Sequence, residues 1–128
     1  MIVATEWPVA ARGAQFSFRE IGMHGSHSAL CACAINADFD EAGTIRSLAI
    51  GVTAVSDRPV LVDTWEFLNS AGNSEWCASV AASAKAKLSF IDDLHASARY
   101  RRHITGVLIE RGLADVIEGN RKYRSKAP

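Results

Sequence analysis

The sequence predicts a single α+β domain, because its strand-like segments all precede its helix-like segments. The 128 residues are enough for one hydrophobic core, and 48% of them are apolar. This composition is typical of a globular chain rather than a disordered one. The 14 basic and 14 acidic residues balance, so no overall field attracts nucleic acid or a membrane surface. A small-molecule or protein partner is therefore expected.

The first part of the chain predicts short strands separated by loops. Residues 2–7 are typical of a short strand, which Pro8 ends. Residues 16–21 fit either a strand or one helical turn, and we favour a strand that runs into a turn. Residues 22–28 are rich in Gly, Ser and His, which predicts a loop.

The next segments predict an antiparallel hairpin. Residues 28–37 are almost continuously apolar, as expected for a central strand that is buried on both faces. Residues 38–43 (DFDEAG) supply the turn, and residues 44–53 alternate in the manner of a second strand. Residues 58–62 predict a short edge strand, a position that tolerates Pro59.

Three helices are predicted after the strands. Asp63 followed by Glu66 resembles a capping box, which would open a helix that ends before Gly72. Asn73 or Ser74 caps the second helix, which carries an i, i+4 apolar stripe formed by Trp76, Val80, Ala84 and Leu88.

The third helix is expected to follow Ser97 as its N-cap. It runs from about residue 98 to residue 118, and Gly119 marks its end. The remaining residues, 121–128, are basic and almost free of apolar positions, so we expect a frayed tail.

Cysteine usage and the N-terminus predict a reduced, cytoplasmic protein. Cys31, Cys33 and Cys77 form neither a C-x-x-C pair nor a zinc spacing. We expect all three to be buried, reduced, small apolar residues. Residues 1–9 lack the basic start and apolar run of a signal peptide, and no segment has the length that spans a bilayer.

The segment 93–108 (DLHASARYRRHITGVL) resembles the C-terminal helix signature of the FAD-binding (medium) subunits of molybdenum hydroxylases. These proteins include aerobic carbon monoxide dehydrogenase and xanthine dehydrogenase. The resemblance covers residues 2–113 and includes the stretches TEWP at 5–8, FREI at 18–21, AIGV at 49–52 and DRP at 57–59. It implies a three-stranded antiparallel sheet packed on a three-helix bundle over residues 1–120, followed by the basic tail.

The sequence departs from this family where the flavin is bound. In the family, glycine-rich loops of two preceding subdomains wrap the FAD pyrophosphate. Here Gly22 and Gly25 are isolated and Gly51 lies in a predicted strand. The resemblance therefore implies a stand-alone domain, starting at Met1, that binds no cofactor alone and meets FAD only through a partner subunit. Residues 23–30 (MHGSHSAL) also replace the arginine-rich, Gly-Asp-aromatic stretch that family members have near the flavin.

His24 and His27 in this altered loop are the first candidate site residues. Two imidazoles three residues apart could form a proton relay or contribute to a metal site, and they could equally be exposed loop side chains. A metal would need a further ligand, which only Glu20, Cys31 or a distant residue could supply. We therefore predict no metal.

The start of the last helix holds the second group of candidates. His95, preceded by Asp92 and Asp93, fits an acid–base pair or a stabilised turn, and we favour the turn. Tyr100 is expected to pack inward with its hydroxyl bonded. Arg101 and Arg102 are expected to pair with acidic side chains, or to bind a substrate carboxylate.

Two functions remain open from the sequence. The chain is either a docking or accessory subunit of an oxidoreductase, or a small cofactor-independent enzyme on the same scaffold. A docking subunit would pair with a flavin or molybdenum hydroxylase subunit, or form a homodimer, through the sheet or through Trp65 and Trp76. An enzyme would use four catalytic residues for acid–base chemistry on a small molecule: His24, His27, Tyr100 and Arg101.

Overall fold

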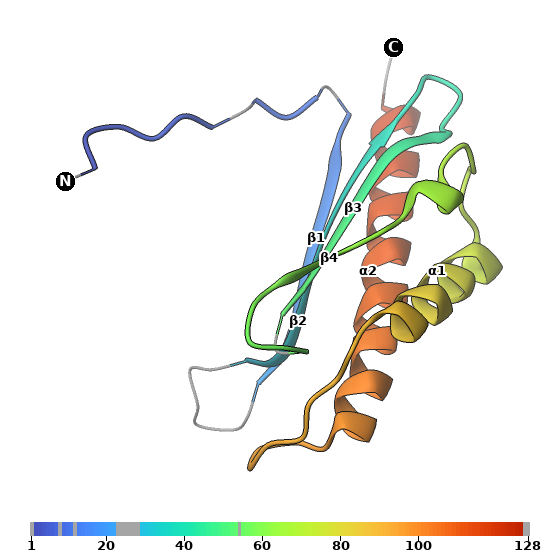
Figure 1. The fold of residues 1–128 in the computed structure, drawn as a ribbon. Coiled ribbons are helices and arrows are strands. Elements are labelled where there is room, and N and C mark those ends of the chain that lie inside the picture. Colours follow the sequence, from blue (N-terminus) through green and yellow to red (C-terminus); the bar gives the residue numbers. More distant parts are fainter. Residues whose placement is uncertain (1, 8, 12, 23–28, 54, 127–128) are drawn as a thin grey trace.

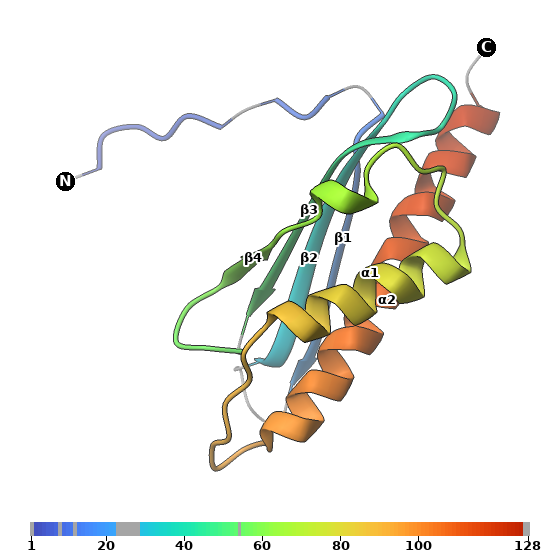
Figure 2. The same ribbon diagram turned by 45° about the vertical axis from the view of Figure 1, so that its right-hand side comes forward.

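The fold is an α+β arrangement in which two helices cover one face of a four-stranded sheet (Figures 1 and 2). The computed structural model describes residues 2–7, 9–11, 13–22, 29–53 and 55–126. The elements in chain order are β1 (Gln15–Gly22), β2 (Ala29–Phe39), β3 (Ile45–Thr53), β4 (Val60–Val62), a 3₁₀ turn η1 (Trp65–Phe67), α1 (Ser74–Lys87) and α2 (Ala98–Ser125).

The sheet is antiparallel throughout, and its strands lie side by side in chain order. The predicted hairpin is confirmed by β2 and β3, and the predicted edge strand by β4. In the turn between β2 and β3, Gly43 has φ of 86°, a conformation that glycine adopts without strain. Across the sheet Phe18 lies opposite Ala34, Ala34 opposite Gly51, and Gly51 opposite Leu61.

The strand predicted at residues 2–7 is wrong, and the favoured strand at residues 16–21 is confirmed as β1. A strand needs a neighbour for its backbone N–H and C=O groups, and no described strand pairs with residues 2–7. This segment extends away from the sheet (Figure 1). The sheet has four strands, β1 to β4, and not the three that the family resemblance implied.

The first predicted helix is also wrong, because only the 3₁₀ turn η1 forms after Asp63. The Glu66 carboxylate does not close a capping box. It accepts hydrogen bonds from Lys87 at 2.8 Å and from Ser83 at 2.9 Å, both on α1. The described chain thus has two α-helices and not a three-helix bundle. The cap of α1 is confirmed, since the Asn73 side chain accepts from the Trp76 backbone N–H at 2.7 Å.

The last helix begins at the predicted cap but ends later than predicted. Gly119 lies inside α2, which continues to Ser125 through the segment expected to be frayed. Beyond Gly119, Asn120 is buried and residues 121–126 are exposed, so tertiary packing supports only the first part of the extension. An ion pair between Lys122 and Glu118, one turn apart, adds support at 3.2 Å.

The core lies between the inner face of the sheet and the two helices. Its fully buried side chains include Ile35, Ile50 and Val52 from the strands and Val80 and Leu113 from the helices. The three cysteines are free and buried, as predicted. No described helix is long and apolar enough to cross a membrane.

Candidate functional site

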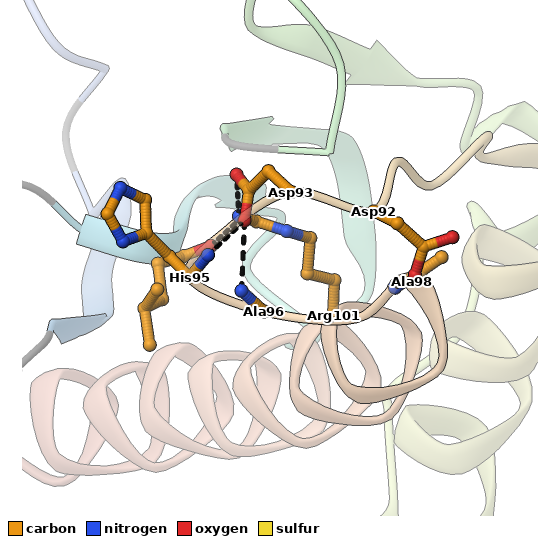
Figure 3. Close-up of polar contacts among 7 residues, drawn as sticks. Asp92, Asp93, His95, Ala96, Ala98 and Arg101 are labelled. Carbon is orange, nitrogen blue, oxygen red and sulfur yellow. Dashed lines mark hydrogen bonds and ion pairs between the residues drawn. The ribbon is translucent and has the colours of Figure 1, made fainter.

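The loop before α2 is organised by carboxylate and hydroxyl caps, and Figure 3 shows the two carboxylates, Asp92 and Asp93. The Ser97 hydroxyl accepts from the Tyr100 backbone N–H at 3.2 Å, and the Asp92 carboxylate accepts from the Ala98 N–H at 2.6 Å. These bonds satisfy amides at the start of the helix that have no partner within it. Asp92 and Ser97 therefore fix where α2 begins.

Asp93 holds the same loop from the other side. One of its carboxylate oxygens accepts from the backbone N–H groups of His95 at 2.8 Å and Ala96 at 2.9 Å. The other oxygen pairs with the Arg101 guanidinium. The bond from Arg101, followed by the two amide bonds, holds the pKa of the Asp93 carboxyl well below its usual range. Asp93 is therefore a carboxylate at neutral pH.

Arg101 joins three parts of the fold. Its side chain is only 4% exposed, although arginine is rarely buried without a partner. Its guanidinium pairs with Asp93 in the loop and donates to the Leu30 carbonyl on β2 at 2.5 Å. The predicted pairing with an acidic side chain is thus confirmed for Arg101. For Arg102 it is wrong among the described residues, since its guanidinium lies over the Phe90 ring and forms no ion pair there. The predicted catalytic role of Arg101 stays a prediction.

The other predicted site residues are not brought together with Arg101 on any described surface. His24 and His27 lie outside the described residues. Tyr100 is 43% exposed, so the expectation that it packs inward is wrong. Successive helical residues point in different directions, which is why Arg101 is buried while Tyr100 faces solvent.

His95 supports the loop through its backbone and not through its ring. Asp92 and Asp93 accept backbone amides, and the His95 imidazole points away from the Asp93 carboxylate (Figure 3). The favoured interpretation of a stabilised turn is therefore supported. Among the described residues, no group of three or more His, Cys, Asp or Glu side chains is placed to hold a metal ion.

The face of the sheet turned away from the helices carries a second candidate site. We call Phe16, Phe18, Ala34, Gly51 and Leu61 the outer sheet face, since alternate residues of each strand point to the same side. The side chains of Phe16, Phe18 and Leu61 are 68%, 54% and 73% exposed. A β-carbon added at Gly51 would meet no atom within 4 Å, so the middle of this face is open.

Trp65 extends the outer sheet face at the end of β4. Trp65 is 71% exposed and borders a hollow of about 340 Å³ that Leu61 and Ala49 also line. Trp76 differs, because it packs edge-on against Phe67 at 6.4 Å between ring centres, and its indole N–H donates to the Phe67 carbonyl at 3.2 Å. Of the two tryptophans proposed for association, only Trp65 presents an open surface.

The sequence reasoning missed Phe16, Phe18 and Leu61 as surface residues. A signal was present in β1, where the two aromatic residues alternate with Ser17 and Arg19. The polar pair faces α2, where both side chains donate to Asp115, so the aromatic pair faces outward. Alternation alone does not say which side of a strand is buried.

Comparisons with known proteins agree with this architecture. The family model described as the CO dehydrogenase flavoprotein C-terminal domain matches residues 16–116. No curated protein matches the sequence.

Among solved structures, the carbon monoxide dehydrogenase of Hydrogenophaga pseudoflava has a TM-score of 0.79 at 22% identity over 88% of this chain and 39% of that chain. Quinoline 2-oxidoreductase of Pseudomonas putida 86 has a TM-score of 0.75 at 20% identity over 85% and 39%. Reconstituted CO dehydrogenase of Oligotropha carboxidovorans has a TM-score of 0.75 at 22% identity over 87% and 39%. The present chain spans about two fifths of the length of these chains. Identities this low show a shared fold.

Proposed function

The chain belongs to the family of CO dehydrogenase flavoprotein C-terminal domains, and from this premise we propose that it is a docking module of an oxidoreductase. Its partner would be the flavin-binding part of a molybdenum-hydroxylase flavoprotein. The observation that carries the proposal is the outer sheet face, where Phe16, Phe18, Leu61 and Trp65 are all more than half exposed.

An apolar face of this kind is typical of an interaction surface. Soluble domains seldom leave several large apolar side chains together in water, and aromatic residues often dominate binding energies. Between the aromatic residues of β1 and the side chains of Leu61 and Trp65 lies a shallow strip of small residues, Ala34, Ala49 and Gly51. The exposed Asn36 of β2 borders it, between Phe16 and Ala49. A partner with a convex apolar surface would fill this strip.

The proposal includes no FAD site on this chain alone. Flavin pyrophosphate is commonly bound by free backbone amides at a helix N-terminus. At α1 such an amide is taken by Asn73, and at α2 such amides are taken by Asp92 and Ser97. The proposed module would therefore reach FAD only through its partner, and no chemical step is assigned to the chain.

The alternative, a cofactor-independent enzyme that uses His24, His27, Tyr100 and Arg101, stays a prediction. No observation on the described part of the chain favours it, because Tyr100 faces solvent and the Arg101 guanidinium is engaged by Asp93 and Leu30.

The experiment is affinity purification of the tagged full chain from its native host, with the co-purifying proteins identified by mass spectrometry. We expect a flavin-binding subunit to co-purify, with visible flavin absorbance in the complex and none in the chain purified alone. Phe18→Glu should abolish this complex. The matched control Leu94→Glu, at a fully exposed apolar residue of the loop before α2, should not.

Three results would contradict the proposal. They are near-equimolar FAD retained by the isolated chain, a complex that survives Phe18→Glu unchanged, or a concentration-independent monomer to which no flavin-binding subunit binds. A homodimer that Phe18→Glu dissociates would keep the outer sheet face as an interface. It would replace the flavin subunit by a second copy as the partner.

A further inference from the structure

A second surface lies on the opposite side of the molecule, in the groove between α1 and α2. A hollow of about 440 Å³ there is lined by Lys85 from α1 and by Arg99, Arg102 and His103 from α2, above the small residues Ala82 and Ala86. We call these six residues the cationic groove. It is separate from the outer sheet face, because both helices cover the inner face of the sheet (Figure 2).

The positive charge of this groove is not neutralised within the described chain. No carboxylate lines the hollow, and none of Lys85, Arg99 and Arg102 forms an ion pair with a described residue. The nearby carboxylates of Asp92 and Asp93 are engaged by backbone amides and Arg101. In a chain whose formal net charge is zero, this is a local excess of cations.

Two contacts hold the cations in place around the groove. The Arg102 guanidinium lies over the Phe90 ring at 5.3 Å from its centre, a cation–π arrangement that restrains its plane. The Lys85 stem lies against α2 at Gly106, where an added β-carbon would come within 2.7 Å of the lysine Cδ. Because Gly106 has no side chain, the Lys85 stem packs closely against α2, and Lys85 lines the groove.

We propose that the cationic groove binds an acidic segment of a partner protein, one with several clustered Asp or Glu side chains. Arg and Lys only donate hydrogen bonds, so their natural ligands are anionic acceptors. The lining side chains of Arg99, Arg102 and His103 are exposed along α2, and Lys85 lines the same hollow from α1. Such an open row can meet several carboxylates along a chain at once.

The proposal does not depend on the proposed function, and its test uses a different probe. The full chain, labelled with ¹⁵N, is titrated with a capped hexaglutamate peptide and followed by NMR. We expect shifts of the backbone amides of residues 82–86 and 99–106. We also expect binding to weaken as ionic strength rises from about 0.01 M to about 0.15 M, where the Debye length falls from about 30 Å to about 8 Å.

Charge reversal in the groove gives the decisive comparison. Arg99→Glu with Arg102→Glu should lower the affinity about tenfold or more, since two attractive pairs become repulsive. The control pair Arg111→Glu with Arg121→Glu changes the net charge equally at exposed positions outside the groove and should lower it much less. Phe18→Glu, which should disrupt the proposed docking at the outer sheet face, should leave hexaglutamate binding unchanged. The two proposals can therefore fail independently.

Several outcomes would overturn the proposal. One is an equal loss of affinity in the control pair, which would indicate a net-charge effect. Another is that hexaglutamine shifts the same amides as strongly. Tighter binding of inorganic pyrophosphate or duplex DNA at these residues would assign the groove to phosphate ligands instead. If the double charge reversal fails to fold by circular dichroism, Arg99→Gln with Arg102→Gln provides the same comparison.

Discussion

Arg19 on β1 and Asp115 on α2 form a two-pronged ion pair, with Nε 2.7 Å from Oδ2 and Nη2 2.8 Å from Oδ1. Ser17, two residues earlier on β1, donates to the same carboxylate at 2.8 Å. This polar contact occupies the side of β1 that faces the helix. It is the physical reason why Phe16 and Phe18 point outward and form the apolar surface proposed for docking.

The first prediction concerns this contact. Asp115→Ala should lower the free energy of unfolding by about 1–2 kcal/mol, because the buried Ser17 hydroxyl loses its acceptor. The half-exposed ion pair itself contributes less, since water and salt screen it. Urea unfolding measures the change. Asp57→Ala is the control: its 3.8 Å pair with Arg58 is exposed, and the change should stay within about 0.5 kcal/mol. Equal effects in both variants would contradict the prediction.

The second prediction concerns Arg101. Arg101→Leu should lower the free energy of unfolding by about 1–3 kcal/mol, because the Leu30 carbonyl and the Asp93 carboxylate lose their charged donor. Asp93→Asn should also destabilise the fold. The double variant should cost less than the sum of the two single variants, because both remove one interaction. Strict additivity in urea unfolding would show that the pair does not act as a unit.

The third prediction is a loss of stability in acid. The pKa values of Asp93 and Asp115 are lowered in the folded chain, for both chiefly by the hydrogen bond from an arginine. Carboxyls with lowered pKa values stabilise the fold above their unfolded pKa of about 3.9, and this stabilisation is lost as the pH falls further. Unfolding measured between about pH 6 and about pH 2 should show the decline. Asp93→Asn should flatten it, and an unchanged slope in that variant would exclude Asp93 as a cause.

The sequence alone was sufficient to predict an element where its local signals agree with its packing in the folded chain. The hairpin of β2 and β3 follows from an apolar run, a turn with Gly43 and an alternating run. The starts of α1 and α2 follow from Asn73 and Ser97, whose side chains cap their helices as predicted. Capping is a contact between residues close in sequence, which is why sequence reasoning could find it.

The sequence alone was insufficient to predict an element or a surface where residues distant in the sequence decide its structure. Glu66 has the spacing of a capping box, but Lys87 and Ser83 bind its carboxylate, and no α-helix forms there. Gly119 looks like a helix end, yet α2 continues beyond it to Ser125. The outer sheet face could not be predicted for the same reason, since the outward direction of Phe18 depends on Asp115, 97 residues away in the sequence.

The fourth prediction concerns the Cys33 thiol. Burial raises the pKa of Cys33 to about 12, so very little thiolate exists at neutral pH, and the thiolate is the reactive form. Cys31 and Cys77 are also buried, and burial raises the pKa of each. The native protein should therefore react slowly with Ellman's reagent at all three cysteines and rapidly in denaturant. Rapid reaction of Cys33 in the native state would contradict its described burial.

The fifth prediction separates the role of the outer sheet face from that of the core. Phe16→Ser and Phe18→Ser should each change the free energy of unfolding by less than about 1 kcal/mol, because both rings are more than half exposed in the isolated chain. Ile35→Ala, on the inner face of β2, should cost about 2–5 kcal/mol, because this side chain is fully buried and its removal leaves a cavity.

The effects of these variants on partner binding should be the reverse of their effects on stability. The two serine variants should weaken binding of the flavin-binding partner, because their rings would become buried only in the complex. Ile35→Ala should bind normally at temperatures where it stays folded, because its side chain does not reach the outer sheet face. If the serine variants instead unfold as readily as Ile35→Ala, the two rings support the fold of the isolated chain. The outer sheet face would then lose its assignment as a docking surface.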